Sequence, residues 1–199
     1  MSDNITINRN QNSPSGVRGI HPHKFTLWVA IGSICMMFAA FTSAYIVKRN
    51  QSKWLDIDLP SAFWFSTIAI IISSVTIHLA FKSFKAREMS RYRTLITITA
   101  ILGIVFCVLQ FIGFSELKDH GIQIFGQGSN PAASFLGVIV GFHVLHVLAG
   151  VAAILFIFIK AYSSKVKNYS LVPIEMISVF WHFVDLLWIY LFIFFMWIR

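Results

Sequence analysis

The chain alternates long apolar runs with short polar segments. Five of the runs contain few charged side chains and are long enough to cross a membrane as α-helices. They cover residues 25–47, 62–81, 94–114, 132–159 and 172–197. Because a helix rises about 1.5 Å per residue, about 20 apolar residues are enough to span a hydrocarbon core about 30 Å thick. The pattern therefore predicts an all-α, polytopic membrane protein, built as a bundle of five transmembrane helices.

The beginning of the chain differs from the rest. Residues 1–23 are rich in Asn, Ser and Gly, contain two prolines and show no apolar periodicity. A segment of this composition cannot bury enough apolar surface to fold on its own. We therefore expect a mobile N-terminal tail at 1–23, followed by a single five-helix transmembrane domain at 24–199.

The composition supports a membrane protein. Of the 199 residues, 57% are hydrophobic and 12% are charged, which is too apolar a balance for a soluble domain of this length. The net charge is +8 at neutral pH, but most basic side chains lie in the short segments between the apolar runs. This distribution is typical of a topology signal, and we expect no nucleic-acid partner.

The basic residues also indicate an orientation. If the five runs cross the membrane in turn, eleven of the 16 Lys and Arg residues fall on the side of the N-terminus and five on the other side. An excess of Lys and Arg marks the cytoplasmic side of a membrane protein. The charge pattern therefore predicts a cytoplasmic N-terminus and a C-terminus on the opposite side.

Two polar motifs interrupt the last two apolar runs. The sequence GFHVLHVLAG places His143 and His146 three positions apart, and WHFVDLLW places His182 and Asp185 in the same relationship. That spacing puts both members of a pair on one face of a helix. An Asp at the centre of a bilayer costs about 2.5–3.5 kcal/mol. We expect Asp185 to be paired, protonated or hydrated, with His182 and the two histidines of the first motif as its candidate partners.

Further polar and small residues complete the candidate set. His78 lies near the end of the second run, Gln110 lies within the third, and Glu116 follows the third. Small residues let neighbouring helix backbones approach closely in membranes. We therefore expect helix-packing roles for Gly137, Gly141 and Gly150.

The residues alone leave two interpretations of the polar set. The four intramembrane histidines and Asp185 could ligate a metal ion or a haem, because imidazole is the commonest metal ligand and helix bundles build sites from facing helices. Alternatively, they could form interhelical hydrogen bonds that fix the register of the helices, which needs only one partner each. The spacing favours the structural role, since an i,i+3 pair of histidines is a weak ligand signature. For Asp185, proton handling and structural pairing stay equally open.

At this point the residues carry a family resemblance. The segments GFHVLHVLAG and WHFVDLLWIYLF resemble the two most recognisable motifs of subunit III of haem-copper oxidases, the cytochrome c and quinol oxidase complexes. Further similarity runs through SAYIVKR, FWFSTIAIIISSVTIHLA and LQFIGFSEL, so that it covers residues 25–199. The length and the number of runs resemble the short bacterial form with five helices.

The resemblance implies a non-catalytic subunit of a respiratory, proton-pumping terminal oxidase. It implies no catalytic residue, cofactor or metal on this chain, with haem and copper held by partner catalytic subunits. The expected partners are the catalytic subunit I, other oxidase subunits, membrane phospholipid and, in some assemblies, a larger respiratory supercomplex. The implied roles are assembly, lipid binding and sustained proton uptake in the bacterial inner membrane, with a periplasmic C-terminus. His143, His146, His182 and Asp185 are then structural or proton-network residues.

One position departs from the family pattern. The first helix of this family commonly carries a Glu directly after a serine, whereas here Ser33 is followed by Ile34. The chain is then either a divergent subunit III or a second, subunit III-like chain of an oxidase supercomplex. Two other classes stay open beside the oxidase subunit, a small polytopic transporter and a haem-binding electron carrier. A transporter of this size might show an internal repeat, and the two halves of the chain show none.

Overall fold

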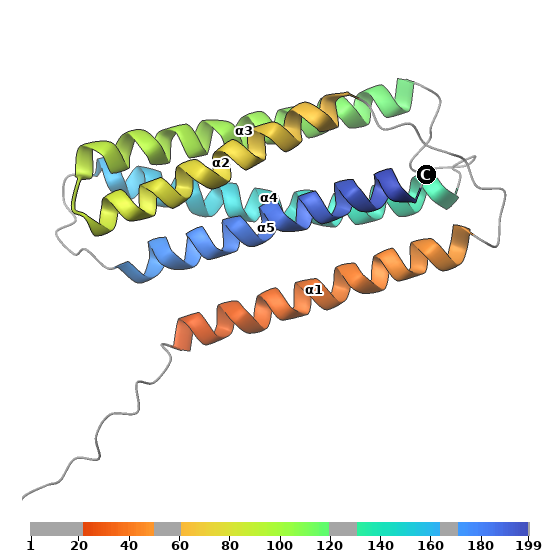
Figure 1. Ribbon diagram of the computed structural model, residues 1–199, viewed down its shortest axis with the longest axis horizontal. Coiled ribbons are helices and arrows are strands. Elements are labelled where there is room, and N and C mark those ends of the chain that lie inside the picture. The colour runs from red at the N-terminus through yellow and green to blue at the C-terminus, as the bar shows by residue number, and fades with distance from the viewer. Residues whose placement is uncertain (1–21, 50–60, 120–130, 164–170, 199) are drawn as a thin grey trace, which may run out of the picture.

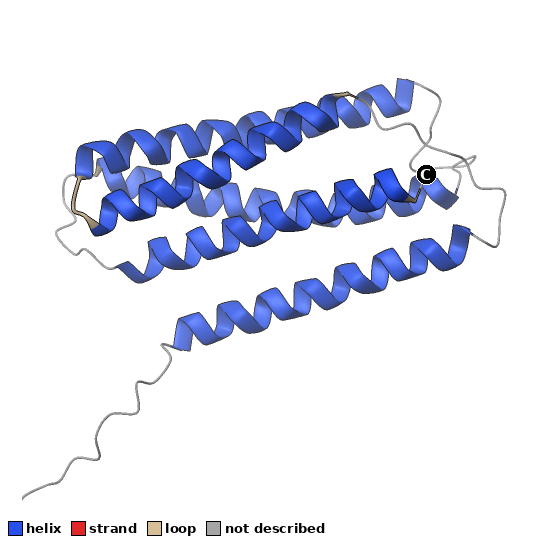
Figure 2. Ribbon diagram, in the orientation of Figure 1, coloured by secondary structure: helices blue, strands red, loops and turns tan. Residues whose placement is uncertain are grey.

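The computed structural model describes residues 22–49, 61–119, 131–163 and 171–198, and these form five α-helices (Figures 1 and 2). They are α1 (Pro22–Arg49), α2 (Ala62–Lys85), α3 (Met89–Asp119), α4 (Pro131–Tyr162) and α5 (Leu171–Trp197). Each is long and apolar enough to cross a membrane. The predicted all-α membrane protein with five transmembrane helices is therefore confirmed.

The helices extend beyond several of the apolar runs. The basic segment 82–93, which lies between two of the apolar runs, is largely helical, because α2 continues to Lys85 and α3 begins at Met89. Arg87, with a φ of 62°, provides the left-handed residue of the tight turn between them. Lys and Arg are good helix formers, so a helix can continue where its apolar run ends. The expected tail lies outside the described residues as far as residue 21, while residues 22 and 23 already belong to α1.

Helices α2 to α5 form a closed four-helix arrangement. Contacts join α2 to α3, α3 to α4, α4 to α5 and α5 to α2. Helix α1 contacts α4 and α5, and lies on the far side of them from α2 and α3 (Figure 1). The polar motifs therefore lie on the two helices, α4 and α5, that also contact α1.

Large aromatic side chains fill the interior, and three glycines make room for them. A Cβ atom at Gly150 would lie 2.9 Å from the Trp181 ring, one at Gly103 would lie 3.1 Å from the same ring, and one at Gly113 would lie 3.0 Å from Phe63. The close approach at Gly150 is consistent with the packing role expected for it. Gly103 and Gly113 were not singled out by the sequence, because an isolated glycine does not show what faces it.

The glycine at 141 behaves differently. No atom of another described helix lies within 4 Å of the place where its Cβ would sit. Gly137 is buried, yet it lines a shallow hollow of ≈ 320 Å³ on this same side of α4 together with Gly141, Phe142 and Leu145.

The outer surface of the helices is apolar. Phe111 of α3 is 77% exposed, Met36 of α1 is 75% exposed and Trp197 of α5 is 80% exposed. In water such a surface would strongly favour association, whereas in a bilayer it is the surface that contacts lipid or other subunits.

Candidate functional site

Hydroxyl side chains of α2 link this helix to α3 and α5. The side chains of Ser66, Thr67, Ser73, Ser74 and Thr76 all make interhelical hydrogen bonds. Gln110 Nε2 donates to Ser66 (3.2 Å), Trp188 Nε1 to Thr67 (3.0 Å) and Trp181 Nε1 to Ser73 (3.1 Å). Ser74 is bonded to His182 Nδ1 (2.6 Å), and Thr76 to Thr99 Oγ1 (2.9 Å). Each bond is made in the low-dielectric interior, where an unpaired indole N–H or amide would be costly. The bonds therefore fix the register of α2 against both neighbours.

Trp188 of α5 is the centre of an aromatic cluster. The imidazole of His143 on α4 stacks on it, with ring centroids 5.2 Å apart and an interplanar angle of 29°. Phe106 of α3 and Phe63 of α2 approach the same indole at 5.4 Å and 5.8 Å. All four helices of the closed arrangement thus contribute one ring to this cluster.

The two histidines of the α4 motif have different surroundings. His143 is fully buried among α2 to α5. His146 is half-buried, faces Phe38 of α1 with ring centroids 5.9 Å apart, and has its Nδ1 atom 2.6 Å from the carbonyl oxygen of Phe142. Three residues advance a helix by about 300°, so the two side chains diverge by about 60° around α4. This divergence directs His143 toward the bundle interior and His146 toward α1. The two side chains therefore do not form a shared site.

Five polar atoms in the interior have no hydrogen-bond partner within the described part of the chain. They are both ring nitrogens of His143, both carboxyl oxygens of Asp185 and Oε1 of Gln110. The three side chains are 0%, 3% and 2% exposed, respectively. Leaving one such group unsatisfied costs about 1–3 kcal/mol. Among the described residues Asp185 makes no hydrogen bond to its candidate partners His182, His143 and His146, and the His182 ring turns to Ser74 instead.

A second polar group lies one helical turn from the aromatic cluster. The rings of His78 on α2 and His182 on α5 have centroids 6.0 Å apart with an interplanar angle of 52°. The hydroxyl oxygen of Ser74 is 2.6 Å from Nδ1 of His182. His78 is exposed, His182 is half-buried and Asp185 is buried. The group therefore runs from the bundle surface to its interior.

The remaining acidic side chains lie near helix ends. Glu116 is half-buried in the last turn of α3, and Glu175 lies in the first turn of α5. The Glu175 carboxylate accepts a hydrogen bond from Nζ of Lys24 at 2.7 Å, which ties the start of α1 to the start of α5. The sequence did not reveal this ion pair, since its members are 151 positions apart.

Metal-ligating side chains do not gather at any point of the described ranges. No three His, Cys, Asp or Glu residues there lie close enough together to hold a metal ion. The histidines instead contact aromatic rings, hydroxyl groups or backbone carbonyls. This arrangement is that of a packed polar interior.

Comparison with known proteins identifies the family. Residues 24–199 match the model of the family described as cytochrome c oxidase subunit III. Cytochrome c oxidase subunit 3 of Corynebacterium diphtheriae is 31% identical over 179 residues, covering 83% of this chain and 85% of that protein. Subunit 3 of the cytochrome bo(3) ubiquinol oxidase of Buchnera aphidicola is 30% identical over 174 residues, covering 85% of this chain and 83% of that protein. Since the match includes all five helices, the chain belongs to the cytochrome c oxidase subunit III family, the non-catalytic membrane subunits of haem-copper oxidases.

Proposed function

We propose that this chain packs beside the catalytic subunit I of a respiratory terminal oxidase in a bacterial cytoplasmic membrane, where it supports assembly, lipid binding and sustained proton uptake. The observation that carries the proposal is the family match over residues 24–199. The haem and copper of the complex are then held by partner subunits. Interhelical hydrogen bonds join α2 to α3 and α5 within this chain.

The proposed orientation has the N-terminus in the cytoplasm and the C-terminus in the periplasm. Lys82 and Lys85 end α2, and Arg91 and Arg93 begin α3 beside them. Lys160 ends α4 at this same side of the bundle, because α3 and α4 are successive membrane-crossing helices. This basic end is the cytoplasmic end according to the distribution of Lys and Arg in membrane proteins.

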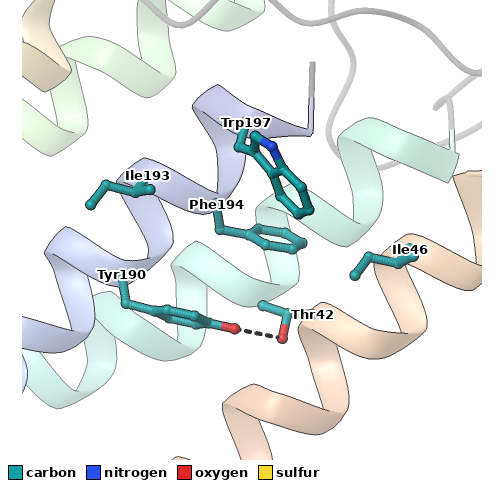
Figure 3. Close-up of a pocket in the computed structure, with 6 residues that line it drawn as sticks. All are labelled: Thr42, Ile46, Tyr190, Ile193, Phe194 and Trp197. Carbon is teal, nitrogen blue, oxygen red and sulfur yellow. Dashed lines mark hydrogen bonds between the residues drawn. The ribbon is translucent and has the colours of Figure 1, made fainter.

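The proposed lipid site is the groove between α1 and α5 (Figure 3). Its volume is ≈ 340 Å³, and it is lined by Thr42, Ile46, Tyr190, Ile193, Phe194 and Trp197. The hydroxyl groups of Thr42 and Tyr190 are 3.0 Å apart and bonded to each other, so the groove offers an almost entirely apolar wall. An acyl chain of a phospholipid fits this chemistry, because both are apolar and the groove opens to the membrane.

The proposed contact with a partner subunit is the hollow on α4. Gly141 has no neighbour within 4 Å of its Cβ position among the described residues, which leaves the helix backbone accessible, and transmembrane helices pack closely at such small residues. We assign this hollow to a transmembrane helix of another oxidase subunit. The family match supports this choice, since members of this family are subunits of multi-chain complexes.

A specific observation favours a second candidate, a subunit III-like chain that accompanies an ordinary subunit III in a supercomplex. Ile34 occupies the position after Ser33 and packs against the core, so this position of α1 holds no carboxylate. Purification of the tagged chain from its native membranes in mild detergent tests both candidates. The proposed function predicts that a haem-copper catalytic subunit is recovered with it. Recovery of one subunit III per catalytic subunit supports the first candidate, recovery of two different ones supports the second, and recovery of no haem protein contradicts both.

A further inference from the structure

Side chains of α3 and α4 line a seam between these two helices, and the seam starts at the basic end of the bundle. It is formed by Arg93, Thr97 and Ile101 of α3 and by Phe158 and Tyr162 of α4. Thr97 and Ile101 lie four and eight residues after Arg93, so successive turns bring them to one side of α3. Polar groups lie at the basic end of the seam and apolar groups lie deeper.

The guanidinium group of Arg93 is held in place by contacts with α4. Its Nε atom donates a hydrogen bond to the carbonyl oxygen of Ala161 at 2.9 Å, in the last turn of α4. The group also lies over the ring of Tyr162, 5.6 Å from the ring centroid. The hydroxyl groups of Tyr162 and Thr97 are 3.3 Å apart, which fixes that ring against α3. The charged group is therefore positioned before any ligand binds.

Most of the donors of this guanidinium group are unused. Within the described part of the chain, Nη1 and Nη2 of Arg93 have no hydrogen-bond partner, and no carboxylate forms an ion pair with it. The bond from Nε accounts for the capping of α4, since a carbonyl oxygen at a helix end needs one donor. The side chain is exposed, so its two terminal amino groups can be reached from outside. Such a planar pair of amino groups matches two oxygens of a phosphate group.

The seam becomes apolar toward the middle of the membrane. Ile101 lies about 12 Å from Arg93 along the axis of α3, and its side chain is 54% exposed. Phe158 lies one turn before Tyr162 on α4, with ring centroids 4.9 Å apart, and is half-buried. A cationic group and a tyrosine above apolar side chains follow the polarity of a membrane interface. A phospholipid has the same order of groups, with the phosphate outside and the acyl chains inside.

The charges around Arg93 favour a headgroup with a net negative charge. Arg91 in the first turn of α3 and Lys160 in the last turn of α4 are both exposed at this end of the bundle. Glu88, the acidic residue that precedes them on the chain, is already paired with Arg91 at 3.6 Å. A zwitterionic headgroup brings an ammonium group close to these cations, whereas phosphatidylglycerol brings only the negative phosphate. Basic side chains next to a membrane attract anionic lipids for this reason.

We propose that the seam between α3 and α4 binds one anionic phospholipid, whose phosphate group accepts hydrogen bonds from Nη1 and Nη2 of Arg93. The glycerol part of the lipid lies beside Thr97 and Tyr162, and an acyl chain lies along Ile101 and Phe158. This site differs from the groove between α1 and α5, whose lining residues carry no charge. The assignment goes beyond the proposed function, because it adds a second lipid site that selects for headgroup charge.

Native mass spectrometry of the purified complex that contains this chain tests the site. The complex is stripped of lipid in detergent and titrated with dioleoyl-phosphatidylglycerol or with dioleoyl-phosphatidylcholine, and the bound lipid molecules are counted at each concentration. We expect one phosphatidylglycerol molecule to bind about tenfold more tightly than phosphatidylcholine, and Arg93→Gln to remove this preference. Inorganic phosphate in excess should not displace the lipid, because it lacks the acyl chain that contacts Ile101.

Arg91→Gln is the matched control. It removes the same charge at the same end of the bundle, but from a side chain that is paired with Glu88. We expect this variant to keep the preference for phosphatidylglycerol. Should Arg93→Gln prevent purification, Ile101→Trp decides the outcome, because it fills the apolar part of the seam from an exposed position and leaves Arg93 in place.

This second variant should also weaken the binding of phosphatidylglycerol. Four results would overturn the proposal. They are equal binding of the two lipids by the unaltered complex, an unaltered preference in Arg93→Gln or Ile101→Trp, equal loss in Arg91→Gln, and displacement of the lipid by inorganic phosphate.

Discussion

His143 of α4 stacks on Trp188 of α5, with ring centroids 5.2 Å apart, at a point where α2 and α3 also contribute an aromatic ring. The histidine motif and the WHFVD motif are therefore joined by an aromatic contact rather than by a shared ligand or a hydrogen bond between their polar groups. Through this contact the two motifs join α4 to α5 inside the bundle. The account predicts that loss of the imidazole weakens the fold without altering any haem.

The first prediction concerns the two histidines of α4. His143→Ala leaves a cavity beside Trp188 and is expected to destabilise the chain by about 2–4 kcal/mol, in the range of large-to-small core substitutions. His146→Ala is expected to cost less, because His146 is half-buried and contacts α1 alone. The amount of chain retained in the purified complex and its thermal unfolding check this order. The haem spectrum should be the same in both variants, and loss of a haem band in an assembled complex would contradict the structural role.

The second prediction concerns Gly150. Gly150→Ala would place a methyl group 2.9 Å from the Trp181 ring, which the closely packed interior cannot easily move away. We expect a loss of about 1–3 kcal/mol in the free energy of unfolding, as for other overpacked cores. Gly32→Ala on α1 is the control, because a Cβ there meets no atom of another described residue within 4 Å. It should be neutral or stabilising by up to about 1 kcal/mol, owing to the higher helix propensity of Ala. Equal effects of the two variants would contradict the packing described for Gly150.

The third prediction concerns the ion pair between α1 and α5. Lys24→Ala and Glu175→Ala are each expected to loosen α1, because the 2.7 Å contact is the charged link at the start of both helices. Both side chains are about one third exposed, so the coupling free energy should stay within about 1 kcal/mol. A double-mutant cycle on thermal unfolding measures it. The exchanged pair, Lys24→Glu with Glu175→Lys, should recover most of the loss, and additive effects of the two single variants would argue against a direct link.

The fourth prediction concerns orientation. A cysteine replacing the exposed Lys85, in a chain without Cys35 and Cys107, should react with a membrane-impermeant thiol reagent only after the cytoplasmic side is opened. This outcome follows from the concentration of basic side chains at this end of the helices. A cysteine at the exposed Trp197, near the other end, should react in intact spheroplasts and serves as the control. Labelling of position 85 in intact spheroplasts would reverse the proposed topology.

The apolar runs were sufficient to predict the helices, since a membrane span has to be both long and apolar. They could not locate the helix ends at 82–93, because Lys and Arg are as compatible with a continuing helix as with a loop. The hydroxyl groups of α2 were not anticipated either. Ser and Thr in a helix commonly bond to their own backbone, as Ser66 and Thr67 also do to the carbonyl of Phe63. Their additional interhelical partners depend on which side of α2 faces α3 and α5, and this emerges only from the tertiary packing.

The sequence located the two polar motifs but did not reveal how their side chains are arranged. Spacing alone suggested that His143 and His146 act together, whereas the position of α4 between the bundle and α1 separates them. His182 was one of the candidate partners of Asp185. In the structure the His182 ring contacts Ser74 of α2 instead, and a serine on another helix cannot be connected to His182 from the sequence.

The most direct test of the account is the behaviour of the oxidase without this chain. The gene is deleted, the remaining complex is purified from the same membranes, and its haem spectrum and oxygen consumption per haem are followed over many turnovers. A non-catalytic subunit that supports assembly and proton uptake predicts an unchanged haem spectrum and normal initial turnover, with lower yield and a rate that declines during sustained turnover. Loss of a haem signal from the purified complex, or full yield with undiminished sustained turnover, would contradict the account.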